Sequence, residues 1–120
     1  MKWGDFFLSN RAKLIRDLKG GGYFKISYPN GKPFIIGYCN NIVENMFGDD
    51  WHGLNCVFFY SFVSGTLKEQ RYCGLERENT LSKPTIKDYK FIEELLGKHD
   101  YRFNRKKRKL YGTSKKGNNI

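Results

Sequence analysis

The chain has 120 residues and a net charge of +10, and its length is that of one domain. Hydrophobic residues make up 39% and aromatic residues 17% of the sequence, a content that excludes a wholly disordered chain. The longest uninterrupted apolar run, residues 56–60, is far too short to span a bilayer. The three cysteines and the absence of an apolar targeting core in the first ten residues predict reduced thiols and a cytoplasmic protein.

The first predicted element is a helix through residues 10–19, with Asp5 or Ser9 as its N-cap. Its apolar residues recur at roughly helical period and predict one buried face: Phe7, Leu8, Ala12, Leu14, Ile15 and Leu18. Three glycines at positions 20–22 are expected to end this helix.

Two strands should follow, over residues 23–28 and 34–39. Phe24 and Ile26 alternate with polar neighbours, and the Asn30-Gly31 pair between the two runs is a strong signal for a hairpin turn. Residues 40–53 are expected to be irregular or to hold one helical turn.

Residues 54–65 give the clearest strand signal. One face is expected to hold Leu54, Cys56, Phe58, Tyr60 and Phe62, and the other Val57, Phe59 and Val63. Because both faces are apolar, the strand should be central in the sheet or covered on both sides. Residues 68–78 are more polar, and their charges are typical of an edge strand.

A second helix is predicted within residues 84–100, where Thr85 and Asp88 have the spacing of a capping box and Gly97 is expected to end the helix. Its buried face should consist of Ile86, Tyr89, Ile92, Leu95 and Leu96. Residues 101–112 alternate enough to form a strand or a short hairpin.

This order of elements predicts an α+β fold, with an antiparallel sheet of about three to five strands and two helices packed on it. We expect a small single domain over residues 1–111 with a basic C-terminal segment, and a polar, flexible tail over residues 112–120.

The positive charge is concentrated at the C-terminal end. Residues 98–120 contain nine Lys or Arg and one acid, whereas residues 1–97 contain thirteen bases and eleven acids. Cations with aromatic rings between them favour nucleic acid, DNA or RNA, or a nucleoprotein complex as the partner. The candidate binding residues are Tyr101, Arg102, Arg105, Lys106, Lys107, Arg108, Lys109, Tyr111, Lys115 and Lys116. A solvated tail and contact with an acidic protein are the alternatives, and no membrane contact is expected.

The remaining motifs give weaker signals. Asp49, Asp50 and His52 have the chemistry of a small metal-dependent nuclease, but no second acidic cluster completes such a site, so no catalytic residue or metal is assigned. Trp51 is a possible anchor for a protein partner.

The cysteines at positions 39, 56 and 73 lack the close pairing of zinc ligands. No cofactor is therefore expected, and Cys56 should be a small buried residue.

A second function class follows from size, basicity and composition. Alanine occurs once, whereas Lys, Asn, Phe and Tyr are abundant, a bias typical of AT-rich bacterial, phage or viral genomes. In these respects the chain resembles accessory proteins of phages and mobile elements, including anti-CRISPR proteins. That resemblance implies an inhibitor of a host defence enzyme or nucleoprotein that acts by protein–protein contact in a bacterial host.

Overall fold

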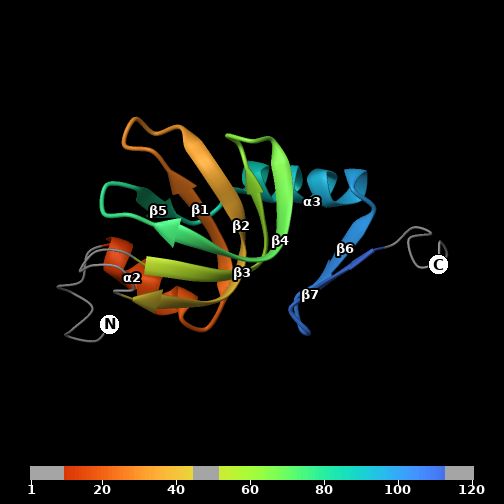
Figure 1. Cartoon of the computed structure of the whole chain (residues 1–120), viewed down its shortest axis with the longest axis horizontal. Coiled ribbons are helices and arrows are strands. Elements are labelled where there is room, and N and C mark those ends of the chain that lie inside the picture. The colour runs from red at the N-terminus through yellow and green to blue at the C-terminus, as the bar shows by residue number, and fades with distance from the viewer. Residues whose placement is uncertain (1–9, 45–51, 113–120) are drawn as a thin grey trace. The chain divides into compact units, whose positions relative to one another are not determined.

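The structure is a computed structural model that describes residues 10–44 and 52–112. It confirms an α+β fold with a five-stranded antiparallel sheet and two helices (Figure 1). The contacts divide the chain into two compact units, Met1–Lys83 and Pro84–Ile120, and we describe each unit by itself. The first unit carries the sheet and helix α2, whereas the second carries helix α3 and a two-stranded hairpin.

Helix α2 (Asn10–Leu18) confirms the helix predicted near the start of the chain, and it contacts the sheet at β1, β2 and β5. Ile15 and Leu18 are buried in the core of the sheet unit, as the helical spacing predicted. The chain leaves the helix at Gly21, which adopts a φ of 91° and donates its amide to the carbonyl of Leu18 at 2.9 Å. The two candidate N-caps lie outside the described residues.

Strands β1 (Gly22–Ser27) and β2 (Pro33–Glu44) form the predicted hairpin. In the turn, the Asn30 side-chain oxygen accepts a hydrogen bond from the Lys32 amide at 2.9 Å, and Gly31 has a φ of 90°. Phe24 and Ile26 are fully buried on the same face, as their alternation predicted.

The expectation of irregular structure after Cys39 is wrong for residues 40–44 and 52–53. Strand β2 continues to Glu44, and strand β3 (His52–Ser61) pairs with it from the first residue. The polar Asn40 and Asn41 obscure the alternation in the sequence, whereas in the sheet a shift of register between Cys39 and Asn41 accommodates them. Residues 45–51 lie outside the described residues.

The predicted faces of β3 are also wrong beyond Cys56. Cys39 pairs with Cys56 and Tyr38 pairs with Phe58, so Val57 is an extra residue that reverses the alternation. Phe59, and not Phe58, therefore belongs with Leu54 and Cys56 to the hydrophobic cluster of the sheet unit. Phe58 and Val57 are buried as well, which confirms that this strand is covered on both faces.

Strand β4 (Thr66–Leu75) lies at one edge of the sheet, as predicted, whereas β5 (Thr80–Ser82) at the other edge was not predicted. The strand order is β4-β3-β2-β1-β5, which would place the two edge strands about 19 Å apart in a flat sheet. A tight turn over residues 76–79 joins them directly, and it is closed by a hydrogen bond that the Asn79 amide donates to the Glu76 carbonyl at 3.1 Å. Because four residues cannot bridge a flat sheet while folded into a turn, the sheet must curl until its edges approach each other (Figure 1).

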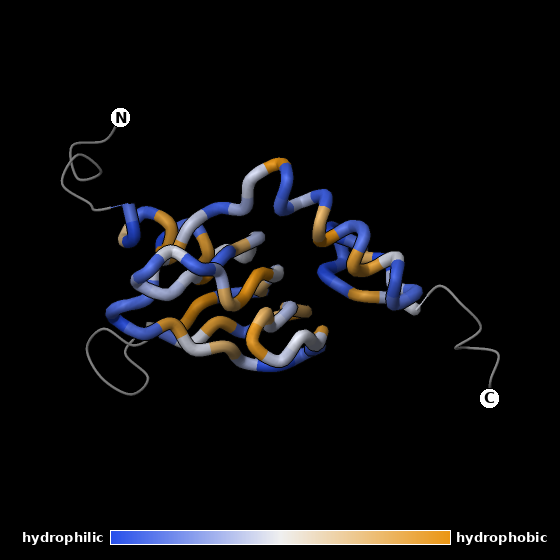
Figure 2. Tube along the Cα trace, turned by 90° about the horizontal axis from the view of Figure 1, so that it is seen from above, coloured by the Kyte–Doolittle hydropathy of each residue, from blue (hydrophilic) through white to orange (hydrophobic). Residues whose placement is uncertain are grey.

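The curled sheet encloses one hydrophobic core, and Figure 2 shows the hydrophobic positions along its strands. Gly37 permits a close approach between β2 and β3. A Cβ atom at this position would lie 2.7 Å from the Cα of Phe59, so any larger residue would have to separate the strands.

Helix α3 (Ile86–Lys98) begins with the predicted capping box. The Asp88 amide donates to the Thr85 hydroxyl at 3.2 Å, and the Thr85 amide donates to the Asp88 carboxylate at 2.9 Å. The predicted stop at Gly97 is wrong. The helix passes through Gly97, and Asp100 takes the left-handed position, with a φ of 60°, that a glycine was expected to occupy.

The predicted buried face of α3 is confirmed for three of its five residues. Ile92, Leu95 and Leu96 are buried, whereas Ile86 and Tyr89 are 78% and 38% exposed. Helical spacing identifies the residues that share a face, but it does not show how far along the helix that face is covered. Strands β6 (Tyr101–Asn104) and β7 (Lys109–Gly112) follow, and α3 contacts β6.

Candidate nucleic-acid interface

The basic segment forms an antiparallel β-hairpin, one of the two conformations predicted for it. Tyr101 lies opposite Gly112, and Asn104 lies opposite Lys109, so the turn consists of residues 105–108. Five consecutive cations therefore surround the tip of the hairpin: Arg105, Lys106, Lys107, Arg108 and Lys109.

Two hydrogen bonds fix the turn. The Asn104 side-chain oxygen accepts from the Lys107 amide at 3.0 Å, and the Arg105 carbonyl accepts from the Arg108 amide at 3.3 Å. Arg108 has a φ of 52°, in the left-handed region that costs a side chain about 1 kcal/mol or more. The sequence therefore places an arginine at a position that glycine would fill more easily.

The two faces of the hairpin differ in exposure. Phe103 and Leu110 lie directly opposite each other, and both are half-buried, as is Tyr101 on the same face. Arg102 and Tyr111 form the opposite pair on the other face, where both are exposed. The apolar face is thus partly covered, and the cations occupy the exposed face and the tip.

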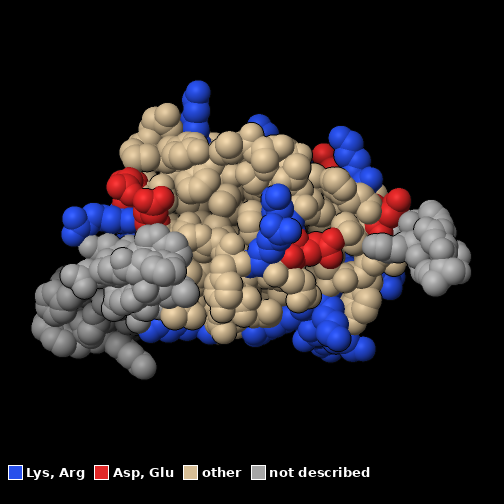
Figure 3. Space-filling model, viewed as in Figure 1, with Lys and Arg blue, Asp and Glu red and all other residues tan. Residues whose placement is uncertain are grey.

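All six cations of the hairpin are exposed, and residues 101–112 contain no acid. Figure 3 shows a group of Lys and Arg side chains where Figure 1 places the turn between β6 and β7. Within the described residues, the side chains of Arg102, Lys106, Lys107 and Lys109 form no ion pair or hydrogen bond. Their charges are available to an anionic partner.

Several predicted site residues lie outside the described residues, namely Asp49, Asp50, Trp51, Lys115 and Lys116. His52 is described: it is the first residue of β3 and is only 8% exposed. No group of three or more His, Cys, Asp or Glu able to hold a metal ion occurs among residues 10–44 and 52–112.

Arg11 has a role that the sequence did not reveal. Its guanidinium donates to the carbonyl of Asn79 at 2.5 Å and to that of Glu76 at 2.9 Å, which ties helix α2 to the turn between β4 and β5. A helix cation that resembles a surface charge in the sequence therefore stabilises the closure of the sheet.

The three cysteines lie on neighbouring strands, Cys39 on β2, Cys56 on β3 and Cys73 on β4. All three are free thiols buried in the core, which confirms the expectation for Cys56. A hydrogen bond with the Cys73 side chain and burial raise the pKa of the Cys56 thiol far above its usual range. All three side chains act as small core residues, and the Cys56 thiol is a poor nucleophile in the folded protein.

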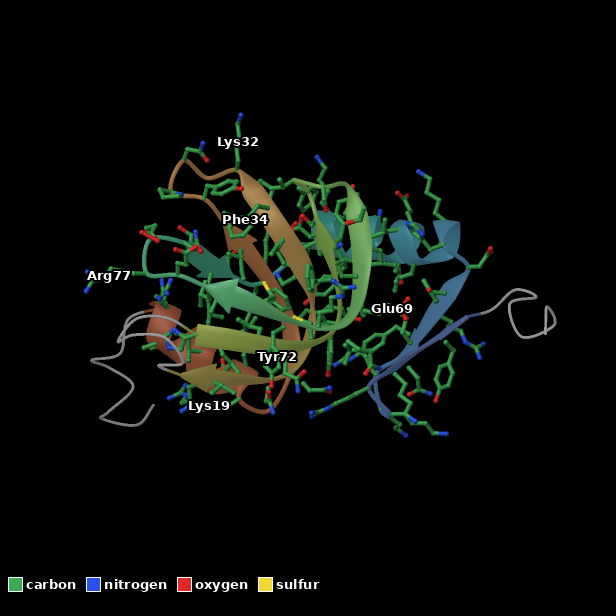
Figure 4. The ribbon with its side chains drawn as sticks, in the orientation of Figure 1. Lys19, Lys32, Phe34, Glu69, Tyr72 and Arg77 are labelled. Carbon is green, nitrogen blue, oxygen red and sulfur yellow. The ribbon has the colours of Figure 1, made fainter. Side chains whose placement is uncertain are left out.

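Aromatic rings gather at the end of the sheet formed by the β1–β2 and β3–β4 turns. The rings of Tyr28 and Phe34 stack with centroids 4.4 Å apart, and those of Tyr60 and Phe62 meet edge to face at 5.0 Å. The Phe62 amide donates to the Phe34 carbonyl at 2.9 Å, which joins the two pairs. Figure 4 shows Lys32 pointing outward from the β1–β2 turn. We call these four rings and the 70% exposed Val63 the aromatic end.

Comparison with known proteins finds no match to this chain. No protein-family model matches the chain, and neither the curated proteins nor the solved structures contain a significant match. Within the described residues, no helix is both long enough and apolar enough to cross a membrane.

Proposed function

We propose that this chain is a non-catalytic nucleic-acid-binding protein and that the tip of the β6–β7 hairpin contacts the phosphates, in bare nucleic acid or in a nucleoprotein complex. The observation that carries the proposal is the set of six exposed cations, with no acid among them, on the twelve residues 101–112. Cations that neutralise phosphates release condensed counterions, which supplies most of the affinity of such binding.

The hairpin also brings these charges close together. Paired strands lie about 5 Å apart, so the backbone positions that carry the cations of the tip lie within about 10 Å of one another, the Debye length at 0.1 M salt. Salt therefore screens their mutual repulsion only in part, and a polyanion that binds the tip relieves it. Such a group of cations favours a partner with closely spaced negative charges.

The test is the salt dependence of binding to a fluorescent oligonucleotide, followed by anisotropy. If residues 105–109 neutralise five phosphates, log K should fall against log salt with a slope of about −3.5 for a single strand or about −4.5 for B-form DNA. Replacing Arg105, Lys106, Lys107, Arg108 and Lys109 together by Gln should remove most of that slope.

A matched variant separates local from global charge. Gln at Lys32, Arg71, Lys83, Lys87 and Lys90 removes the same five charges from exposed positions outside the hairpin. This control should keep a slope close to that of the wild type. Equal slopes for the wild type and the hairpin variant would reject the proposed site.

The aromatic end favours a second candidate, contact with a host protein as an inhibitor or adaptor of the anti-CRISPR kind. Tyr28 and Phe62 are each 39% exposed beside Val63, and exposed aromatic clusters are typical of the central residues of protein interfaces. In this function the basic hairpin would accelerate association with an acidic or nucleic-acid-bearing target.

A nuclease-treated pull-down with Val63→Asp distinguishes the two candidates. Capture of one defined host protein that survives nuclease, is lost in Val63→Asp and persists in the five-residue hairpin variant would favour the second candidate. Loss of all capture after nuclease would reject it.

A further inference from the structure

Resting on this proposed function, we propose that the ligand of the β6–β7 hairpin is double-stranded, B-form DNA and that the tip enters its major groove. The dimensions of the hairpin agree with this geometry. Each strand has four residues, about 13 Å, and the pair is about 5 Å wide between backbones. The major groove of B-form DNA, about 12 Å wide and 8.5 Å deep, admits a two-stranded β-ribbon.

The distribution of charge on the hairpin suits a groove walled by two phosphate backbones. The turn cations project at the tip, while Arg102 and Lys109 extend the charge along both strands. A ribbon that enters a groove tip first can therefore meet phosphates on both of its sides.

Single strands fit this surface less well. Proteins that bind single strands stack successive bases on several exposed rings. Tyr111, 39% exposed, is the one exposed ring among residues 101–112, because Tyr101 and Phe103 belong to the half-buried face. One ring supports one base, so stacking along a strand is not available here.

Double-stranded RNA is a poorer fit for a different reason. Its A-form major groove is too deep and narrow for side chains to read, and proteins that recognise its shape span about 16 base pairs across two minor grooves. A single ribbon of about 13 Å covers only part of that length. Among duplexes, the hairpin therefore matches B-form DNA best.

The test compares three oligonucleotides of one sequence, a DNA duplex of about 16 base pairs, its single strand and the RNA duplex, at about 0.15 M salt. The DNA duplex should bind at least about tenfold more tightly than the other two, with a salt slope near −4.5. A glucosyl group on C5-hydroxymethylcytosines, which fills the major groove, should weaken binding by about tenfold or more, and a polyamide that occupies the minor groove should not compete.

Equal or tighter binding of the single strand or of the RNA duplex overturns this inference. So does competition by the polyamide without an effect of the glucosyl group.

Different results would reject the nucleic-acid-binding function and the assignment of duplex DNA as its ligand. If single strands bind as tightly as duplexes but lose their salt slope in the five-residue hairpin variant, the function stands and only the duplex assignment is wrong. If no oligonucleotide binds, or the hairpin variant binds all of them like the wild type, the proposed function itself is wrong.

Discussion

In the sheet unit, the guanidinium of Arg11 donates to two backbone carbonyls, whereas in the hairpin Arg102 and the turn lysines are exposed and form no ion pair within the described part of the chain. The sheet unit carries eleven bases and eight acids over residues 1–83, while the hairpin carries six bases and no acid. The same residue types thus stabilise the fold in one unit and remain available for a partner in the other. The presence of a nearby acceptor decides between these roles, and net charge does not.

Replacing a glycine by alanine should change the free energy of unfolding in opposite directions in the two units. Gly37→Ala places a Cβ atom 2.7 Å from the Cα of Phe59 and should lower the free energy of unfolding by about 3 kcal/mol. Gly97, in α3, has no neighbouring atom within 4 Å of its added Cβ, so Gly97→Ala should raise stability by about 0.5–1 kcal/mol. Urea unfolding of both variants measures the difference. A Gly37→Ala variant as stable as the wild type would contradict this account of β2 and β3, and a loss of stability in Gly97→Ala would contradict the open space around Gly97.

Arg11→Ala should cost about 2 kcal/mol, because two backbone carbonyls lose a charged donor that closes the sheet. Lys13→Ala on the same helix is the control. Within the described residues the Lys13 side chain forms no ion pair or hydrogen bond, so its loss should change stability by less than about 0.5 kcal/mol. Equal effects of the two variants in urea unfolding would mean that Arg11 is an ordinary surface charge.

The buried thiols predict a loss of stability in alkali. Because the pKa of Cys56 is raised in the folded state, the unfolded chain releases its thiol proton first, so stability is full below the ordinary pKa and falls as pH rises above about 9. The loss should reach about 1–2 kcal/mol by about pH 10. The check is the difference in pH profile between the wild type and Cys56→Ala, which should lack this contribution. Identical profiles would show that the thiol ionises normally in the fold.

Arg108→Gly separates charge from conformation in the hairpin. Glycine removes the cost of the left-handed backbone, so stability should rise by about 1 kcal/mol, while the loss of one cation should reduce the magnitude of the duplex salt slope by about 0.9. Arg105→Gln is the matched variant. It should reduce the slope by the same amount without the gain in stability, and a gain in both variants would argue against strain at Arg108.

The local parts of the fold follow from local signals in the sequence. Thr85 and Asp88 marked the start of α3, and Asn30-Gly31 marked the β1–β2 turn, because the residues that satisfy each turn are neighbours in the chain. The exchange of Phe58 for Phe59 in the core and the closure through β5 depend on pairing between distant strands. No local pattern contains that information.

The candidate site shows the same difference between what local sequence patterns predict and what depends on distant residues. Charge density located the cations of the hairpin, and alternation indicated that they lie on strands or at a turn. The contribution of Arg11 to the fold and the gathering of Tyr28, Phe34 and Phe62 from two turns required the three-dimensional arrangement.

Amide chemical-shift mapping of the full chain on addition of the DNA duplex tests the central claim most directly. The largest shifts should occur at Asn104, at residues 105–109 and at Tyr111, and they should decline as salt rises. Shifts confined to Tyr28, Phe34, Phe62 and Val63, with the hairpin unchanged, would contradict the account and move the binding surface to the aromatic end.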